Sequence, residues 1–177
     1  MSKSFLKEQN KGFTILEMVV AIFILVVAIL GTYSIFSRMA MVTSTASAKL
    51  TAAYLAQEGI EIVRNIRDTN WLDGSVAWDN GIINCASGCE ADYTTNSGVG
   101  GATPLKSWII PGEFLYIDED GFYRYNGITP TGFTRKITVT EVPGHEDEVL
   151  NVEVEVSWDD RGTGYSFVAE TDLYNWR

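Results

Sequence analysis

The sequence has 177 residues, of which 46% are hydrophobic, and a net charge of −10. The first twelve residues hold Lys3, Lys7 and Lys11 against Glu8, a balance of +2, so the remaining chain carries −12. An acidic body of this size repels phosphate backbones, which argues against direct binding of nucleic acid. The length fits one domain with an appendage.

A long apolar segment begins at Phe13. Met18 to Leu30 contains thirteen residues without a charge. With its flanks through Ser37 the run reaches about 25 residues, enough to cross a bilayer core as a helix, and only Glu17 interrupts it. A simple signal anchor, or a cleavable signal ending at Ala46-Ser47-Ala48, would share this length. Neither explains Glu17, because a carboxylate in hydrocarbon costs on the order of a few kcal/mol.

The lysines of the chain's first residues all precede this segment. The excess of positive charge on that side predicts that the N-terminus stays cytoplasmic and that the acidic body crosses the membrane.

The stretch "KGFTILEMVVAIFIL" resembles the N-terminus of type IV pilins and of the pseudopilins of type II secretion and competence systems. That family has a short basic leader ending in glycine, then phenylalanine, three small or apolar residues, and a glutamate that opens a long apolar helix. Lys11-Gly12, Phe13, Thr14-Ile15-Leu16 and Glu17 match in order and spacing. The resemblance is close over about thirty residues, and the rest of the chain fits in architecture only.

The resemblance implies cleavage by a prepilin peptidase between Gly12 and Phe13, and N-methylation of the new amino terminus at Phe13. It also implies that the Glu17 carboxylate serves assembly, by pairing with the Phe13 amine of its own or a neighbouring subunit. Pairing offsets much of the cost of a buried charge. Many major pilins carry a helix-breaking proline in this region, whereas this chain has Gly31, so a kink or local melting there stays open.

The helix is predicted to continue from Phe13 to about Arg67, because no proline interrupts this range. Its outer half carries an apolar stripe at helical spacing, which predicts packing against a sheet or, alternatively, a coiled-coil seam. Gly59 lies within the stripe and would let a sheet approach the backbone closely. The stripe consists of Ala52, Leu55, Ala56, Gly59, Ile62, Val63 and Ile66.

Two cysteines, Cys85 and Cys89, lie in a turn-rich region between residues 69 and 112. In an exported domain they predict a short disulfide that staples this long loop, the alternative being two free thiols. Zinc would need two more ligands, and His145, the sole histidine, is remote in sequence.

Three tryptophans, Trp71, Trp78 and Trp108, lie in the same region. They would form a binding surface for sugar or protein, or cover the helix and the sheet edge.

After Pro111 the hydrophobic period changes to two. "FLYI" and "FYRY" flank Asp118-Glu119-Asp120-Gly121, which predicts a hairpin, and "LNVEVEVSW" alternates strictly. An antiparallel meander is expected, with its apolar face on the helix stripe. Asp118 and Asp120 suggest a fragment of a calcium loop, but the bidentate glutamate of such a loop is missing at its spacing, so no cofactor is expected.

These patterns predict an α+β, pilin-like fold in which the outer half of a long N-terminal helix packs on an antiparallel sheet. The expected segments are a leader (1–12), a transmembrane and assembly half-helix (13–37), an amphipathic half-helix (38–68), a variable loop (69–112) and the sheet (113–177).

The expected function is that of a structural pilin-like subunit, a minor pilin, in a type IV pilus-type filament. Its partners would be a prepilin peptidase, other pilin subunits and, before assembly, the membrane. The chain would sit in the inner or cytoplasmic membrane with its C-terminal domain outside, and later in an extracellular or periplasmic filament. The alternatives are a pseudopilin and, from a different class, a monomeric single-span surface protein that binds glycan or protein. No enzyme is expected, because nucleophile, phosphate-binding and zinc motifs are lacking.

Overall fold

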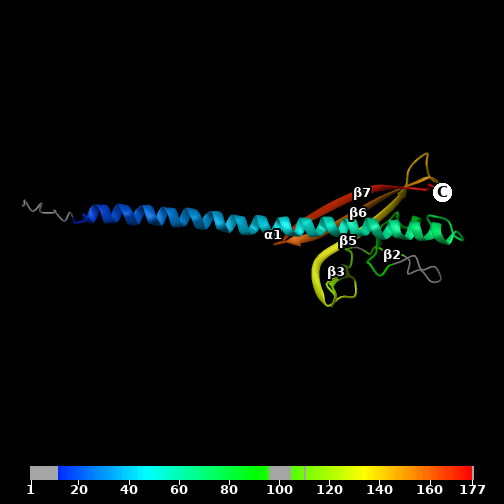
Figure 1. The fold of residues 1–177 in the computed structure, drawn as a ribbon, viewed down its shortest axis with the longest axis horizontal. Coiled ribbons are helices and arrows are strands. Elements are labelled where there is room, and N and C mark those ends of the chain that lie inside the picture. Colours follow the sequence, from blue (N-terminus) through cyan, green and yellow to red (C-terminus); the bar gives the residue numbers. More distant parts are fainter. Residues whose placement is uncertain (1–11, 96–104, 110, 177) are drawn as a thin grey trace, which may run out of the picture. The chain divides into compact units, whose positions relative to one another are not determined.

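The computed structural model describes residues 12–95, 105–109 and 111–176, so the predicted leader lies outside the described residues except for Gly12. The chain divides into two units between Ser44 and Thr45. One α-helix, α1 (Ile15–Asp73), runs through both (Figure 1). The other elements are η1 (Ile83–Cys85), β1 (Cys89–Glu90), β2 (Lys106–Ser107), β3 (Phe114–Ile117), β4 (Tyr123–Arg124), β5 (Thr129–Glu141), β6 (Val149–Asp160) and β7 (Thr163–Tyr174).

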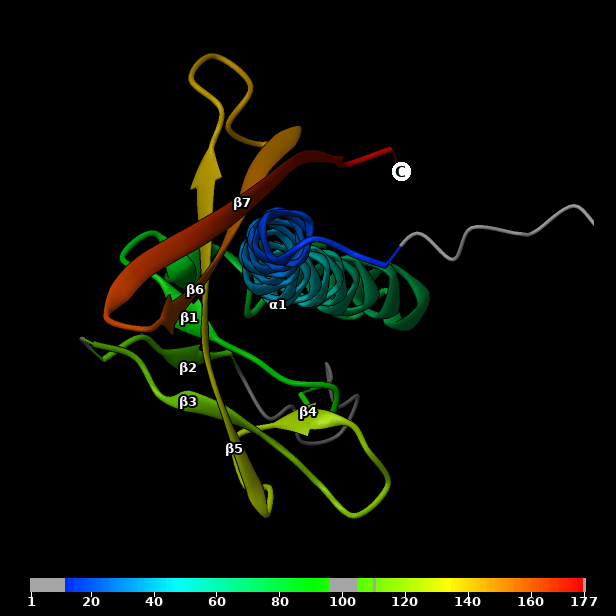
Figure 2. The same ribbon diagram turned by 90° about the vertical axis from the view of Figure 1, so that its left-hand side faces the viewer.

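The strands form one antiparallel sheet of seven strands. β5, β6 and β7 make the predicted meander and lie along one side of the helix (Figure 2). The second edge of β5 pairs with β3 through residues 129–134 and with β1 at Ile137. The predicted hairpin forms between β3 and β4, with Gly121 at a φ of 88° in its turn. The α+β prediction is therefore confirmed.

The helix stripe and the strict alternation of β6 meet in one core. All seven stripe positions are buried, as are Leu150, Val152, Val154, Val156 and Trp158, so sheet packing rather than a coiled-coil seam is correct. A Cβ placed on Gly59 would lie 2.9 Å from Val154 Cγ1. The prediction that glycine permits a close approach at this point is confirmed, and that contact offsets the low helix propensity of glycine.

The helix ends at Asp73, beyond the end predicted near Arg67. Asn70 is buried, and its amide donates to the carbonyls of Trp78 and Asn80 at 3.0 and 2.9 Å. Gly74, with a φ of 62°, then closes the helix by donating to the carbonyl of Asn70. The extra turns depend on these contacts across the chain, which a periodicity in sequence does not reveal.

The region predicted as an aperiodic loop contributes η1, β1 and β2 to the fold. These elements are only two or three residues long, too short to give a periodic signal. Trp71 is buried and Trp78 partly buried, with ring centroids 6.4 Å apart. Trp108 packs beneath Gly112, where a Cβ would collide with its ring. These tryptophans therefore contribute mainly to covering the fold.

Arg135 is the largest fully buried side chain and joins three parts of the fold. From β5, its Nη1 donates to the Leu55 carbonyl at 3.0 Å and to the Glu58 carboxylate at 2.8 Å, both on α1. Its Nη2 donates to the carbonyl of Ala91, in the segment after β1. A buried charge of this kind is tolerated only while its partners remain in place.

We predict that Glu58→Ala lowers the free energy of unfolding by about 1.5–3 kcal/mol, because it leaves the buried Arg135 guanidinium without its counter-charge. Glu61→Ala is the matched control: Glu61 is exposed and pairs with Arg64 on the same helix, so its loss should cost less than about 0.5 kcal/mol. Urea unfolding of the two variants provides the comparison. Equal effects would show that the pair with Arg135 does not hold the helix to the sheet.

Candidate functional site

The first turn of α1 is built as a helix cap. Thr14 precedes the helix, and its Oγ1 accepts a hydrogen bond of 3.2 Å from the backbone N–H of Glu17. The Thr14 carbonyl accepts from the N–H of Met18 at 3.2 Å. Thr14 and Glu17 thus have the spacing of a capping box, in which threonine and glutamate satisfy the free N–H groups of a helix start. The positive end of the helix dipole also favours a carboxylate at Glu17.

The next stretch of helix, residues 18–37, contains no charged side chain. It lies between the charged residues Glu17 and Arg38. Every residue between Gly12 and Ser44 whose burial the structure describes is exposed, including Ile15 at 84% and Phe36 at 68%. Among the described residues, one helix is long and apolar enough to cross a membrane, and this stretch is the reason. An apolar surface of this extent needs lipid or other helices around it.

The serine and threonine hydroxyl groups of this segment bond within the helix. Thr32 donates to the Ala28 carbonyl at 2.8 Å, and Ser37 donates to the Tyr33 carbonyl at 3.1 Å. Ser34 makes the same kind of bond to the carbonyl three residues before it. Hydroxyls bonded in this way can enter an apolar environment without an unsatisfied donor.

Gly12 and Phe13, the predicted cleavage residues, lie immediately before this capped helix, and both are exposed. A Cβ built on Gly12 meets nothing within 4 Å, and the backbone there does not have a positive φ. The described structure therefore imposes no need for glycine at this position. The leader residues before it, 1–11, are outside the described range.

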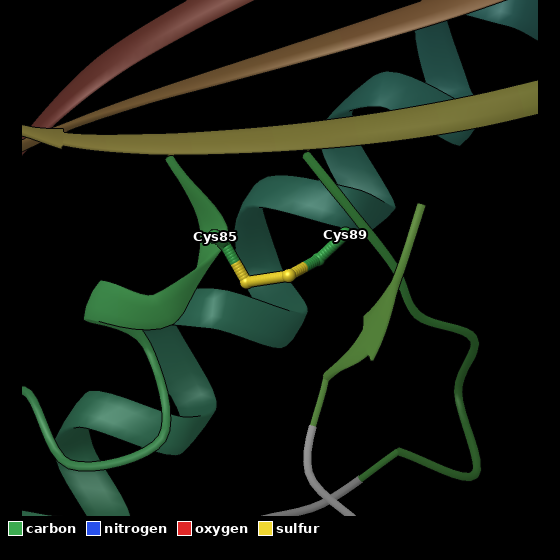
Figure 3. The surroundings of a disulfide bond; sticks show 2 residues. All are labelled: Cys85 and Cys89. Atoms are coloured by element: carbon green, nitrogen blue, oxygen red, sulfur yellow. A yellow bond between two sulfur atoms is a disulfide. The ribbon is translucent and has the colours of Figure 1, made fainter. Parts of the chain in front are cut away.

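The second predicted feature lies in the sheet-bearing unit. Cys85, in η1, and Cys89, at the start of β1, are joined by a disulfide with a Cα–Cα distance of 5.2 Å (Figure 3). Both residues are buried, at 0% and 2% exposure, and belong to the main core. The bridge therefore fastens the segment after α1 to the strand that pairs with β5 at Ile137.

Asp118, considered from the sequence as half of a calcium site, is occupied by protein donors. Tyr93 Oη donates to its Oδ2 at 2.7 Å, and the backbone N–H groups of Phe122 and Asp120 donate to its Oδ1 at 2.9 and 3.0 Å. These bonds, that of Tyr93 first, lower the pKa of the Asp118 carboxyl below its usual value. Through the bonds from Asp120 and Phe122, the Asp118 carboxylate stabilises the turn between β3 and β4.

We predict that Tyr93→Phe raises the pKa of Asp118 toward its ordinary value, because the largest stabiliser of the charged carboxylate is removed. Tyr174→Phe, an exposed tyrosine elsewhere in the sheet, is the control and should leave this pKa unchanged. An NMR titration of the Asp118 carboxyl carbon measures both. An unaltered pKa in Tyr93→Phe would mean that the hydrogen bond does not form in solution.

The remaining candidates are His145 and the side chains that could bind a metal ion. His145 lies in an exposed turn, and its Nδ1 is 3.1 Å from a carboxylate oxygen of Glu148. Within the ranges that the structure describes, no three His, Cys, Asp or Glu side chains gather in a way that could hold a metal ion.

Two structural roles are absent from the sequence-based expectations. Thr14 is only a spacer in the family pattern, although the four letters T-I-L-E carry the capping-box signal. The role of Arg135 has no such signal, because its partners lie 77 and 80 residues away on α1.

Comparison with known protein families matches residues 8–33 to the prokaryotic N-terminal methylation motif. This is the signature of type IV pilin and other prepilin-type sequences, and it covers Lys11, Gly12, Phe13, Glu17 and the first part of the apolar stretch. No curated protein matches the chain. No solved structure matches it either.

Proposed function

We propose that this chain is a structural pilin-like subunit, a minor pilin, of a type IV pilus-type filament. A prepilin peptidase would cleave it after Gly12, Phe13 would be N-methylated, and the exposed half of α1 would then carry it from the membrane into a helix bundle. The observation that carries the proposal is the methylation motif over residues 8–33, whose second half coincides with the exposed, uncharged stretch of α1 that begins at residue 18. The motif is that of a structural rather than an enzymatic class of proteins.

The distribution of apolar exposure along α1 supports assembly through this helix. Past the membrane-length stretch, large apolar side chains are exposed as far as Val42 and, after the small and polar residues 43–49, again at Leu50 and Tyr54, at 57% and 63%. Beyond them the exposed residues of the helix are mostly polar, as at Gln57, Glu61 and Asn65. An anchor alone needs only about 20 apolar residues. The additional apolar surface fits contacts with the helices of neighbouring subunits.

Two glycines support the same proposal, since the described fold does not need them. Gly12 has open space around it and would suit a peptidase that must reach the following bond. Gly31 lies within α1, and a Cβ added there would also meet nothing within 4 Å, although a helical glycine costs about 1 kcal/mol relative to alanine. Small residues let helix backbones approach each other in an apolar bundle.

Glu17 has two candidate roles that predict different behaviour. Within one subunit it is the third residue of a capped helix, a position that glutamine fills equally well. In an assembled filament its negative charge would neutralise the amine created on Phe13 by cleavage, which glutamine cannot do. The isosteric substitution separates the cap from the charge.

We predict that Glu17→Gln leaves membrane insertion intact or improved and sharply reduces incorporation into filaments. Removal of the carboxylate relieves an insertion cost of about 2–3 kcal/mol, whereas the Phe13 amine would enter an apolar bundle without a counter-charge. The measurements are the amount of protein in the membrane fraction and in sheared filaments.

Thr14→Ala is the control for this experiment, because it removes the cap and retains the charge. It should weaken the first turn by about 1 kcal/mol and affect assembly much less than Glu17→Gln. If Glu17→Gln assembles as well as the wild type, pairing of the Glu17 carboxylate with the Phe13 amine is refuted.

A further inference from the structure

The last strand of the sheet, β7, has one edge without a partner. Among the described residues, β7 pairs with β6 alone, in a continuous register that runs from Asp160↔Thr163 to Val149↔Tyr174 without a bulge. Figure 1 shows β7 on the outside of the sheet, with β6 and then β5 beyond it. A free edge of this kind presents a row of backbone N–H and C=O groups that can pair with a further strand.

The hydrogen bond between Asn175 and Glu148 identifies the backbone groups of β7 that face this edge. The N–H of Asn175 donates to the Glu148 carbonyl at 2.7 Å, one step beyond the last pair of the β6–β7 ladder. Because hydrogen-bonded and non-hydrogen-bonded pairs alternate in an antiparallel ladder, every second residue back from Asn175 bonds to β6. The residues between them turn their N–H and C=O groups to the free edge. All of them are exposed: Gly164, Ser166, Val168, Glu170, Asp172 and Tyr174.

β7 lacks the features that usually protect an edge strand from pairing. Its twelve residues include no proline, lysine or arginine, and the side chains on its inner face are uncharged. The other terminal strands of the described sheet, β2 and β4, are only two residues long. Natural sheets block their edges with proline, lysine, bulges or short strands. Within the described fold, β7 is therefore the edge best suited to the addition of a strand.

Two apolar side chains in the middle of β7 favour a partner in the form of a strand. Phe167 lies opposite the buried Val156 and therefore on the inner face, whereas Val168, the next residue, lies on the outer face. Phe167 is 36% exposed and Val168 49%. A helix or a flat surface docked on one face of the sheet would cover only one of them. A strand paired with the edge extends both faces and covers both.

The outer face beside this edge is acidic. Glu170 lies directly opposite Glu153 of β6, and like charges in this position destabilise a sheet. The Asn151 amide donates to Glu170 at 2.8 Å and to Asp172 at 3.0 Å, so a neutral group bridges two of the three carboxylates. Lysine or arginine side chains on an added strand would offset the repulsion that remains.

β7 runs in the same direction as the part of α1 that packs on the sheet. Asp160, at the end of β6, accepts a hydrogen bond of 3.2 Å from Thr45, and Trp176, just after β7, packs on Trp71 near the end of α1. Antiparallel pairing of two β7 strands would therefore set residues 45–73 of two copies antiparallel. Subunits anchored in one membrane have parallel helices. The choice of a different chain as partner thus rests on the proposed function, whereas the free edge does not.

We propose that the free edge of β7 binds an extended segment of a different polypeptide. Apolar residues of that segment would meet Phe167 and Val168, and basic residues would meet Glu170 and Asp172. Its main chain would bond to the edge groups of residues 164–172, the mode of recognition in which a peptide adds a strand to a sheet.

The test uses the full chain in a zwitterionic detergent, titrated with a fluorescently labelled peptide in which lysine and valine alternate over the length of β7. A control peptide of the same sequence carries N-methyl groups on the lysine amides, which would face β7. It keeps the charge and loses the backbone pairing. We expect saturable binding of the first peptide and binding weaker by about tenfold or more for the second, because main-chain hydrogen bonds provide the affinity in this mode.

Hydrogen exchange locates the bound peptide on the wild-type chain. The amides of Ser166, Val168 and Glu170 should exchange about tenfold more slowly, or slower still, when the peptide is present, because a bonded amide exchanges only when the pairing opens. The amide of Glu119, in the acidic and exposed turn between β3 and β4, should not change. Protection at that turn would instead indicate non-specific attraction between the lysines and the acidic chain.

Val168→Pro tests the same edge from the side of the protein. It removes an N–H that faces the edge and leaves the ladder to β6 in place, a position at which edge strands accept proline. It should weaken peptide binding by about fivefold or more. Val168→Thr is the matched control, because it keeps the N–H and the β-branched shape, and it should bind as the wild type does. Urea midpoints close to the wild type would establish that both variants are folded.

The proposal is overturned if the lysine–valine peptide does not bind, if its N-methylated form binds equally well, or if protection appears away from residues 164–172. It is also overturned if the chain self-associates and Val168→Pro abolishes that association, which would assign the edge to a second copy. None of these outcomes concerns cleavage after Gly12, so the pilin-like proposal stands or falls by its own experiment.

Discussion

The buried Arg135 guanidinium fixes the architecture of the sheet-bearing unit. It lies on β5 and bonds to two successive turns of α1, through Leu55 and Glu58, and to the segment after β1 through Ala91. A charge at zero exposure is expensive, so the surrounding helix, strand and loop must stay together to satisfy it. Gly59 lies one residue beyond Glu58 and lets Val154 approach the helix. Charge and close packing therefore determine the same helix-to-sheet contact.

One helix meets two kinds of surroundings. From Thr45 onward, its buried stripe has a partner in β5 and β6. Up to Ser44, its residues whose burial the structure describes are exposed, and the hydroxyl groups of Thr32, Ser34 and Ser37 bond to carbonyls of the same helix. The part of α1 before Thr45 is therefore suited to an apolar environment, which the other described residues of the chain do not provide. Together with the methylation motif, this asymmetry supports a subunit that leaves the membrane only to join other helices.

Much of the fold was predictable from the sequence because it depends on local patterns. The stripe from Ala52 to Ile66, the alternation from Leu150 to Trp158 and the β3–β4 turn are periodic or turn signals that the fold uses directly. The helix end at Asp73, the short strands β1 and β2, and the bonds of Arg135 depend on residues far apart in the chain. At the candidate site, a sequence motif identified Gly12, Phe13 and Glu17. The capping role of Thr14 was identified only from the hydrogen bond in the structure.

We propose, as the central claim, that residues 13–37 form the transmembrane and assembly half of the helix, and that cleavage after Gly12 removes the leader before it. The most direct measurement is intact and N-terminal mass spectrometry of the exported protein, purified from a host that contains a prepilin peptidase. We predict a mature chain that begins at Phe13 and carries a methylated amine. A chain that retains Met1 to Gly12, or one that begins at Lys49 after an ordinary secretory cleavage, would contradict this claim.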